Sequence, residues 1–550
     1  MKHQEKEEDQ EKMLFRAWQE KDKLSLRKNK IFNQLFTKRK LLTLKEEQNK
    51  SKYLINISLI STNQELISNP ELYIKTKFDI QNYFPYLISE NILQIKEVLY
   101  LINLYIKLQI NEIPIEKRAL SNNDYELINC LCHYLNYNDK QIAFYSCKIL
   151  NELGFFNNSI EKMIYSEKNL KEILTFFNKN NFEFGTDFIS LLINCCNDND
   201  VRKFLVDNKI IERISFLINN NLDELENRYY IYLIKLLCSI IKLFYEYEEY
   251  YKTKRKKWFE PLLPFFKKTL KNNFVENPWQ KNSESIYYVE LLTFFSILAD
   301  KDVNLTSEII KDDFDQVLIE FYYKLDEEYK IDMMKVFVNL LSNDDSINEI
   351  FIKEGILGLL INEINRIEYK NNKLLYRIFQ ACSNIACGTL GQVEQLYAQG
   401  LLWKAIDISY YFITQNIINF DINEVIYNGI FTLNQAILGG SNEIKAELII
   451  YQEYLIVNLY YLALKNYGEK KSEIGFLAQM GNAISKLISC GEGDLDQEIF
   501  EEFRNKFIIV GMEELIDNIL GNYKNELLYK IFSFILNFIQ ENDNYQKFNV

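Results

Sequence analysis

Apolar residues recur along this chain at helical spacing, three or four positions apart. The strict alternation of apolar and polar residues that is typical of strands does not occur. Four segments resemble one another, beginning at Cys147, Phe188, Met334 and Phe379. In each, an apolar run reaches an Asn, a short polar break follows, and apolar residues at helical spacing resume. The pattern predicts a helical protein built from a repeated unit.

The Asn, or a Ser in its place, marks the register of the repeat. It recurs every 43 to 57 residues, at Asn103, Asn151, Asn194, Ser239, Ser296, Asn339, Asn384, Asn434, Ser485 and Asn537. A period in the forties with three short helices per unit is typical of armadillo and HEAT repeats. One unit cannot bury its apolar face alone, so stacked units share a continuous core. We predict an all-α, armadillo-repeat, right-handed superhelical solenoid of about ten repeats over residues 51–545.

Two copies carry a glycine 16 residues past the Asn, namely Gly355 and Gly400. Glycine adopts a left-handed conformation at little cost, so each is expected to end a helix. The third helix of each repeat should line a concave groove, where a row of Asn side chains can hydrogen-bond an extended peptide. Alternatively, these Asn residues only end helices or hold loops. Their shared register favours the row.

The charge of the chain is unevenly distributed. The net charge is -13, yet residues 1–50 hold 14 Lys/Arg against 9 Asp/Glu, which leaves -18 for residues 51–550. An acidic body behind a basic arm indicates basic partners or an arm that folds back on the body. A body that binds duplex DNA is usually basic, so direct nucleic-acid binding is not expected.

The basic arm has its own pattern. Between Arg16 and Lys40 there are nine Lys/Arg and two acids, and 16–36 could form an amphipathic helix with apolar residues Leu24, Leu26, Ile31, Leu35 and Phe36. The arm contains Leu26-Arg27-Lys28-Asn29-Lys30 and then Lys38-Arg39-Lys40. This spacing resembles the importin-β-binding segment of the importin-α family, which also has about ten armadillo repeats. Residues from Ser383 to Leu402 are the closest local match.

The resemblance implies a nuclear import adaptor that shuttles between cytoplasm and nucleus, with no cofactor. Its groove would hold basic nuclear localisation signals, and its arm would bind importin-β or occupy the groove. The cargo-binding residues that the resemblance implies are Asn151, Asn194, Asp198, Asn339, Asn384 and Asn434. Those it implies for the arm are Arg16, Arg27, Lys28, Lys30, Lys38, Arg39 and Lys40.

The chain departs from the family where signal lysines are bound. The family has Trp four residues before each Asn, whereas this chain has Leu99, Cys147, Ser190, Lys335, Gln380 and Ile430. Arg377 also stands where the seventh repeat of the family often has Glu. Cargo recognition is therefore expected to be weak or altered. A scaffold of armadillo type that assembles proteins without transporting them is the alternative.

Other features are less specific. The nine cysteines have no zinc-ligand spacing and are expected to be buried free thiols. His133, one of two histidines, is expected to pack in the core. The basic run at 252–258 could be a localisation signal, a phosphate-binding patch or a solvated helix start. With neither a phosphate loop nor a nucleophile motif, we expect no enzyme activity, and no apolar stretch is long enough to span a membrane.

Overall fold

A computed structural model describes most of the chain from Asp79 onwards. The described residues are 79–112, 124–154, 163–178, 185–196, 198–220, 227–241, 257–276, 284–299, 303–367, 370–415, 419–468, 473–523 and 525–546. The predicted arm at residues 1–50 lies outside them. Every regular element among the described residues is helical. None of these helices is both long and apolar enough to cross a membrane.

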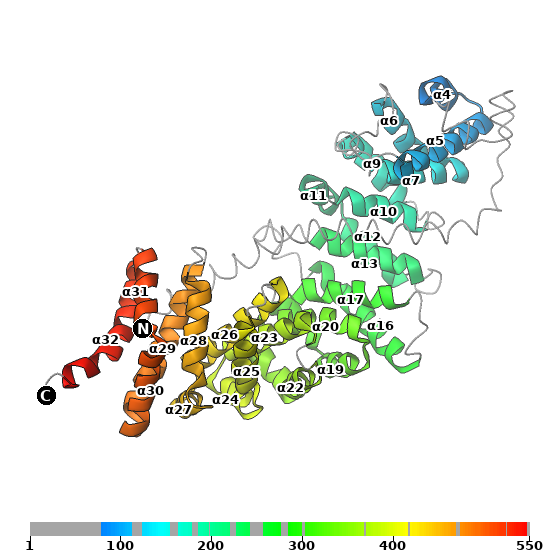
Figure 1. Ribbon diagram of the computed structural model, residues 1–550. Helices are drawn as coiled ribbons and strands as arrows, with labels where there is room; N and C mark the ends of the chain where they lie inside the picture. Colours follow the sequence, from blue (N-terminus) through cyan, green and yellow to red (C-terminus); the bar gives the residue numbers. More distant parts are fainter. Residues whose placement is uncertain are drawn as a thin grey trace. The chain divides into compact units, whose positions relative to one another are not determined.

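The chain divides between Ile297 and Leu298 into two compact units. The N-terminal unit contains twelve elements of the described chain, the last of which ends just past the boundary (Figure 1). They are α4 (Ile80–Leu87), α5 (Ile92–Glu112), α6 (Asp124–Leu135), α7 (Lys140–Leu153), α9 (Glu167–Asn178), α10 (Gly185–Cys195), α11 (Asn199–Asp207), α12 (Ile210–Asn220), α13 (Asn227–Ile241), η5 (Glu260–Leu262), α16 (Leu263–Glu276) and α17 (Glu284–Ala299).

The described residues of the C-terminal unit form five successive helix triplets. We call the helices of a triplet H1, H2 and H3. The triplets are α18 (Val303–Ile310), α19 (Phe314–Lys324), α20 (Glu327–Leu340); α21 (Asp345–Lys353), α22 (Ile356–Ile367), α23 (Asn372–Ala386); α24 (Leu390–Ala398), α25 (Leu401–Thr414), α26 (Phe420–Gly439); α27 (Asn442–Ile450), α28 (Leu455–Tyr467), α29 (Ile474–Asp494); and α30 (Gln497–Val510), α31 (Met512–Asn522), α32 (Glu526–Gln546). In the N-terminal unit, α11, α12 and α13 form the same triplet.

The H1–H2 corners of the six described triplets share one backbone feature, although the α18–α19 and α27–α28 corners contain further residues with positive φ. The residue just before H2 is left-handed in each: Lys209, Asp313, Gly355, Gly400, Tyr454 and Gly511. Gly355 has φ 93° and Gly400 has φ 78°, which confirms the expectation for these two glycines. Lys209, Asp313 and Tyr454 adopt the same conformation without the freedom of glycine, so the corner is a property of the repeat and not of one residue type.

The ten register marks lie on ten different helices, which confirms the repeat predicted from the sequence. The helices are α5, α7, α10, α13, α17, α20, α23, α26, α29 and α32. Within the N-terminal unit, α5, α7, α10 and α13 pack one on the next. Within the C-terminal unit, α20, α23, α26, α29 and α32 do the same. The fold is therefore an all-α armadillo-repeat solenoid, in which successive repeats within each unit pack on one another.

The core lies along these stacked helices, all of which we call H3 helices from here on. On α23, the side chains of Leu375, Ile378, Phe379 and Cys382 have no exposed surface, because the helix contacts α20, α22, α24 and α26. Of the nine cysteines, seven are buried as expected, Cys130 is half-buried, and Cys387 is exposed just past the end of α23. Its position at a helix end explains the difference.

Candidate functional site

The candidate site consists of Asn side chains on the stacked H3 helices of each unit, which we describe unit by unit and call the amide row. It comprises Asn151 on α7, Asn194 on α10, Asn339 on α20, Asn384 on α23 and Asn434 on α26. Asn194, Asn339 and Asn384 are half-buried, whereas Asn151 and Asn434 are buried. Only the three half-buried side chains present surface that a bound peptide can reach directly.

In the N-terminal unit, neighbouring members of the amide row bond to each other. The side-chain nitrogen of Asn194 donates to the side-chain oxygen of Asn151 at 2.9 Å. The hydroxyl of Tyr165 donates to the backbone carbonyl of Asn194, also at 2.9 Å. The first bond joins α7 and α10 across a repeat boundary, and the second joins α10 to the turn before α9. The amides therefore already stabilise the stack, and a bound peptide has to compete for them.

The C-terminal unit has a related arrangement. The side chain of Asn384 donates to the backbone carbonyl of Val338 at 2.8 Å, and so connects α23 with α20. Asn343, four residues after Asn339, donates to the carbonyls of Ala299 at 2.6 Å and Asn339 at 2.7 Å. Sequence reasoning missed Asn343, although it follows its register mark by the same four residues that separate Asp198 from Asn194.

Asn434 does not fit the predicted role. Its side chain has no exposed surface, and its oxygen accepts a hydrogen bond from the Tyr460 hydroxyl at 2.7 Å. Its side-chain nitrogen has no hydrogen-bond partner in the structure. Since α26 continues to Gly439, this Asn lies within the packed helix and not at its end. A direct peptide contact at Asn434 is therefore not supported by its position.

Asp198 is exposed, and it caps a helix. Its carboxylate oxygen Oδ1 accepts from the amides of Asp200 at 2.8 Å and Val201 at 3.2 Å, the first turn of α11. Asp344 occupies the same place before α21 and accepts from the amide of Ser346 at 2.8 Å. The hydroxyl and amide of Ser346 hold the pKa of Asp344 below its usual value. Capping explains both residues without a ligand, although the carboxylate of Asp198 stays within reach of solvent.

The positions where the importin-α family has Trp hold no comparable slot. Cys147, Gln380 and Ile430 are buried within the H3 stack, while Ser190 and Lys335 are half-buried. Lys335 forms an ion pair with Asp332 on its own helix. These positions provide no aromatic face for the stem of a bound lysine.

Arg377 carries positive charge on this same surface. Its Nη1 donates to Oε1 of Gln380 at 2.7 Å, and its guanidinium lies over the Tyr376 ring, 4.8 Å from the centroid. A guanidinium on an aromatic face is a stable arrangement, which keeps this charge in place. The surface at α23 therefore carries positive charge where the importin-α family often has Glu.

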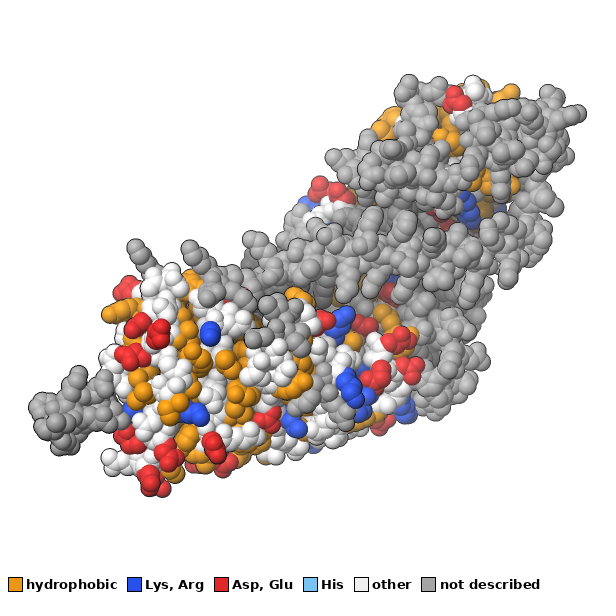
Figure 2. Space-filling model, in the orientation of Figure 1, with side chains coloured by type: hydrophobic (Ala, Val, Ile, Leu, Met, Phe, Trp, Pro, Cys, Tyr) orange, Lys and Arg blue, Asp and Glu red, His pale blue; other side chains and the backbone are white. Residues whose placement is uncertain are grey.

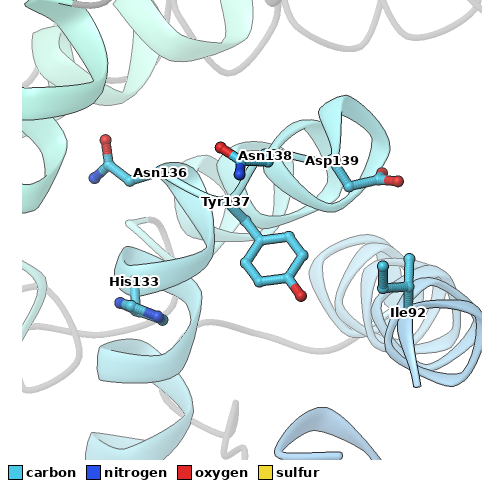
Figure 3. A pocket seen from close by; sticks show the side chains of 6 residues that line it. All are labelled: Ile92, His133, Asn136, Tyr137, Asn138 and Asp139. Carbon is cyan, nitrogen blue, oxygen red and sulfur yellow. The ribbon is translucent and has the colours of Figure 1, made fainter. Parts of the chain in front are cut away.

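An open depression of about 510 Å³ lies between the start of α5 and the α6–α7 corner. It is lined by Ile92, His133, Asn136, Tyr137, Asn138 and Asp139 (Figure 3). His133 is exposed, not packed in the core as expected, because it lies on the face of α6 opposite Leu131 and Cys132. Figure 3 shows the Tyr137 ring between His133 and Asp139, so these two titratable groups do not form a catalytic pair.

Asp139 in this depression has a structural partner. It caps α7 through the amides of Gln141 and Ile142 and forms an ion pair with Lys96 at 2.7 Å. Partial burial opposes ionisation, but the bonds from Lys96 and the two amides outweigh it and lower the pKa of Asp139. Among the described residues, no cluster of His, Cys, Asp and Glu is arranged to hold a metal ion.

The remaining predicted residues divide by position. The arm residues Arg16, Arg27, Lys28, Lys30, Lys38, Arg39 and Lys40 all lie outside the described residues. Of the basic run at 252–258, only the last two residues are described. Lys257 is exposed, whereas Trp258 is buried and donates from its indole nitrogen to Glu212 at 3.0 Å.

Comparison with known proteins extends the description of the fold. No family model matches the sequence, and no curated protein matches it. Among solved structures, the chain resembles an engineered protein from the Northeast Structural Genomics Consortium, with 14% identity and a TM-score of 0.59, over 84% of this chain and 99% of that one. A designed armadillo repeat protein has 17% identity and a TM-score of 0.38, covering 50% of this chain and 99% of its own.

A third structure concerns a conserved phosphorylation switch that controls the interaction between cadherin and beta-catenin. It has 10% identity and a TM-score of 0.48. The match covers 89% of this chain and 99% of that one. At these identities, a likeness concerns the fold and not the function.

Proposed function

We propose that this protein is a binding module that holds an extended segment of a partner protein along its stacked H3 helices. The half-buried amides of the amide row carry this proposal. Packed helices lie about 8–10 Å apart, and an extended peptide rises about 3.3 Å per residue, so successive repeats meet the peptide every two to three residues. An Asn side chain can both donate to and accept from a peptide backbone, which makes it suitable at each step.

In its finer form, the proposal is an adaptor of importin-α type that shuttles between cytoplasm and nucleus. Asn194, Asp198, Asn339 and Asn384 would face a basic localisation signal, with Asn151 behind Asn194, and the arm would recruit an importin-β-like carrier. The pattern of Arg27, Lys28 and Lys30 followed by a second basic cluster supports this form. So does the contrast between a basic arm and an acidic body.

Binding of ordinary basic signals should be weak. A peptide has to replace the bonds from Asn194 to Asn151 and from Asn384 to Val338, each of which contributes about 1 kcal/mol net. It also finds no aromatic slot and meets Arg377. These features favour the alternative, a scaffold of armadillo type that does not transport cargo.

Capture of a purified importin-β-type carrier by the full-length chain tests the finer proposal. The unaltered chain should retain the carrier, and the triple variant R27A/K28A/K30A should lose it. The variant K45A/K50A removes charge outside the basic pattern and should bind as the unaltered chain does. If the unaltered chain captures no carrier, the scaffold alternative gains and the transport role fails.

The triple variant also allows the H3 surface to be tested separately, by titration with a simple basic signal peptide. The dissociation constant should be micromolar or larger, which corresponds to a binding free energy no stronger than about -8 kcal/mol. Nanomolar binding would show that the missing aromatic slots do not matter.

A further inference from the structure

Two neighbouring H1 helices of the C-terminal unit, α27 and α30, expose the same pattern of side chains. On α27, Glu443, Glu447 and Ile450 are exposed at positions i, i+4 and i+7, which lie on one side of a helix. On α30, Glu498, Glu502 and Ile509 are exposed at positions i, i+4 and i+11 of the same kind. The two helices contact each other, so their exposed faces adjoin.

Two of the three cations of these helices are buried, whereas the third, Lys506 on α30, is half-buried. Lys445 on α27 and Arg504 on α30 are each only 9% exposed. Arg504 bonds to Glu501 at 3.0 Å, and its guanidinium lies over the ring of Phe538, 4.8 Å from the centroid. The exposed glutamates, Glu443, Glu447, Glu498 and Glu502, outnumber the half-buried Lys506, so the exposed face of α27 and α30 is net acidic.

Acidic residues continue beyond this face. From Glu492 to Asp517 the chain has nine Asp/Glu and two Lys/Arg. Glu513 and Glu514 at the start of α31 are exposed as well. Figure 2 shows red side chains gathered over the end of the C-terminal unit that contains α30 and α31. A surface of this charge attracts basic segments over a distance of about one Debye length.

Two adjacent isoleucines add exposed apolar area to this acidic surface. Ile508 is 48% exposed and Ile509 is 77% exposed, at the end of α30. Exposed apolar side chains bordered by carboxylates fit the two faces of a basic amphipathic helix, because one side of such a helix is apolar and the other is cationic. The surface thus fits a helix with leucines and isoleucines beside arginines and lysines.

This chain contains such a segment. We propose that residues 16–36 dock as a basic amphipathic helix on the exposed faces of α27 and α30. Arg27, Lys28 and Lys30 pair with the glutamates, and apolar residues of the arm cover Ile508 and Ile509. Residues 41–78 connect the arm to Asp79, and 38 residues can span on the order of 125 Å when extended. The amide row is a different surface, so this inference does not rest on the proposed function.

Carbodiimide cross-linking of the full-length chain tests the docking, since it joins a lysine amine to a carboxylate in direct contact. At low salt and high dilution, mass spectrometry of the monomer should find Lys28 or Lys30 joined to Glu447, Glu498 or Glu502. In 1 M salt, where the Debye length falls to about 3 Å, the yield should drop sharply.

The variant I508D/I509D leaves every cross-linkable glutamate in place and removes the apolar contact. It should lower the yield by about tenfold, which corresponds to about 1.4 kcal/mol. The matched control is Ile350→Asp, which changes an isoleucine 38% exposed on α21 and should leave the yield unchanged. Circular dichroism checks that each variant is folded. Cross-links to the H3 surface, cross-links between two copies, or no cross-links from arm lysines would each overturn the proposal.

Discussion

Gly355 lies at the H1–H2 corner and Gly358 lies three residues later, within the helix. Replacing each by alanine distinguishes the need for a left-handed residue at the corner from the general preference of helices for alanine. Gly355 has φ 93° and Gly358 lies inside α22, and an added Cβ at either position meets nothing within 4 Å. Gly355→Ala should destabilise by about 1–2 kcal/mol, because the left-handed conformation disfavours a side chain. Gly358→Ala should instead stabilise by up to about 1 kcal/mol, because alanine favours the helix.

Thermal melts followed by circular dichroism measure both variants. Changes in stability of opposite sign would establish that the corner needs a left-handed residue. Equal losses of stability would mean that the added methyl group clashes at both positions. The left-handed corner was predictable at Gly355 and Gly400, since glycine marks it in the sequence. It was not predictable at Lys209 or Tyr454, because these residue types do not favour a positive φ, whereas Asp313 is of a type that adopts it more often.

Helix contacts in the C-terminal unit include one buried ion pair that joins neighbouring triplets. Nζ of Lys330 on α20 lies 3.0 Å from Oε1 of Glu363 on α22, and both side chains are less than 10% exposed. Arg366 also bonds to Glu363. Glu363→Ala leaves Lys330 buried beside a single remaining carboxylate, Glu327, so it should cost about 3 kcal/mol.

Glu327→Ala is the matched control, since Glu327 contacts the same two cations but has a side chain 57% exposed. Its loss should cost less than about 1 kcal/mol. Native-state hydrogen exchange of the α20 and α22 amides measures both locally, which suits a repeat protein whose units can open separately. Equal effects of the two variants would contradict the role assigned to burial.

The period of the apolar pattern predicted the repeat, and all ten register marks lie on helices of their own. The contacts of individual marks were not predictable. Asn194 bonds to a side chain of the preceding H3 helix, Asn384 bonds to a backbone carbonyl, and Asn434 is enclosed beside Tyr460. Asn residues at the same register position have different hydrogen-bond partners, because those partners come from the neighbouring repeat, which is distant in sequence.

Acid stability is a property that both units should share. The pKa of Asp139 in the N-terminal unit and those of Glu327 and Asp344 in the C-terminal unit are lowered. For Glu327, bonds from Arg366 and Lys330 outweigh the opposing effect of burial. A carboxyl group with a lowered pKa in the folded state stabilises the protein above its unfolded pKa, about 3.9 for Asp and 4.3 for Glu. This contribution is lost as pH falls through the folded pKa.

Urea midpoints should therefore stay level from pH 7 to about 5 and fall steadily below pH 4. Asp344→Asn tests the contribution of one carboxyl group to this acid response, because Asn also caps helices well but does not titrate. The variant should fall slightly below the unaltered chain at pH 7 and lie closer to it at pH 3, because the advantage of the charged cap shrinks as pH falls through the lowered pKa of Asp344. Midpoints that rise on acidification, or a variant that loses stability equally at both pH values, would show that these caps do not control the acid response.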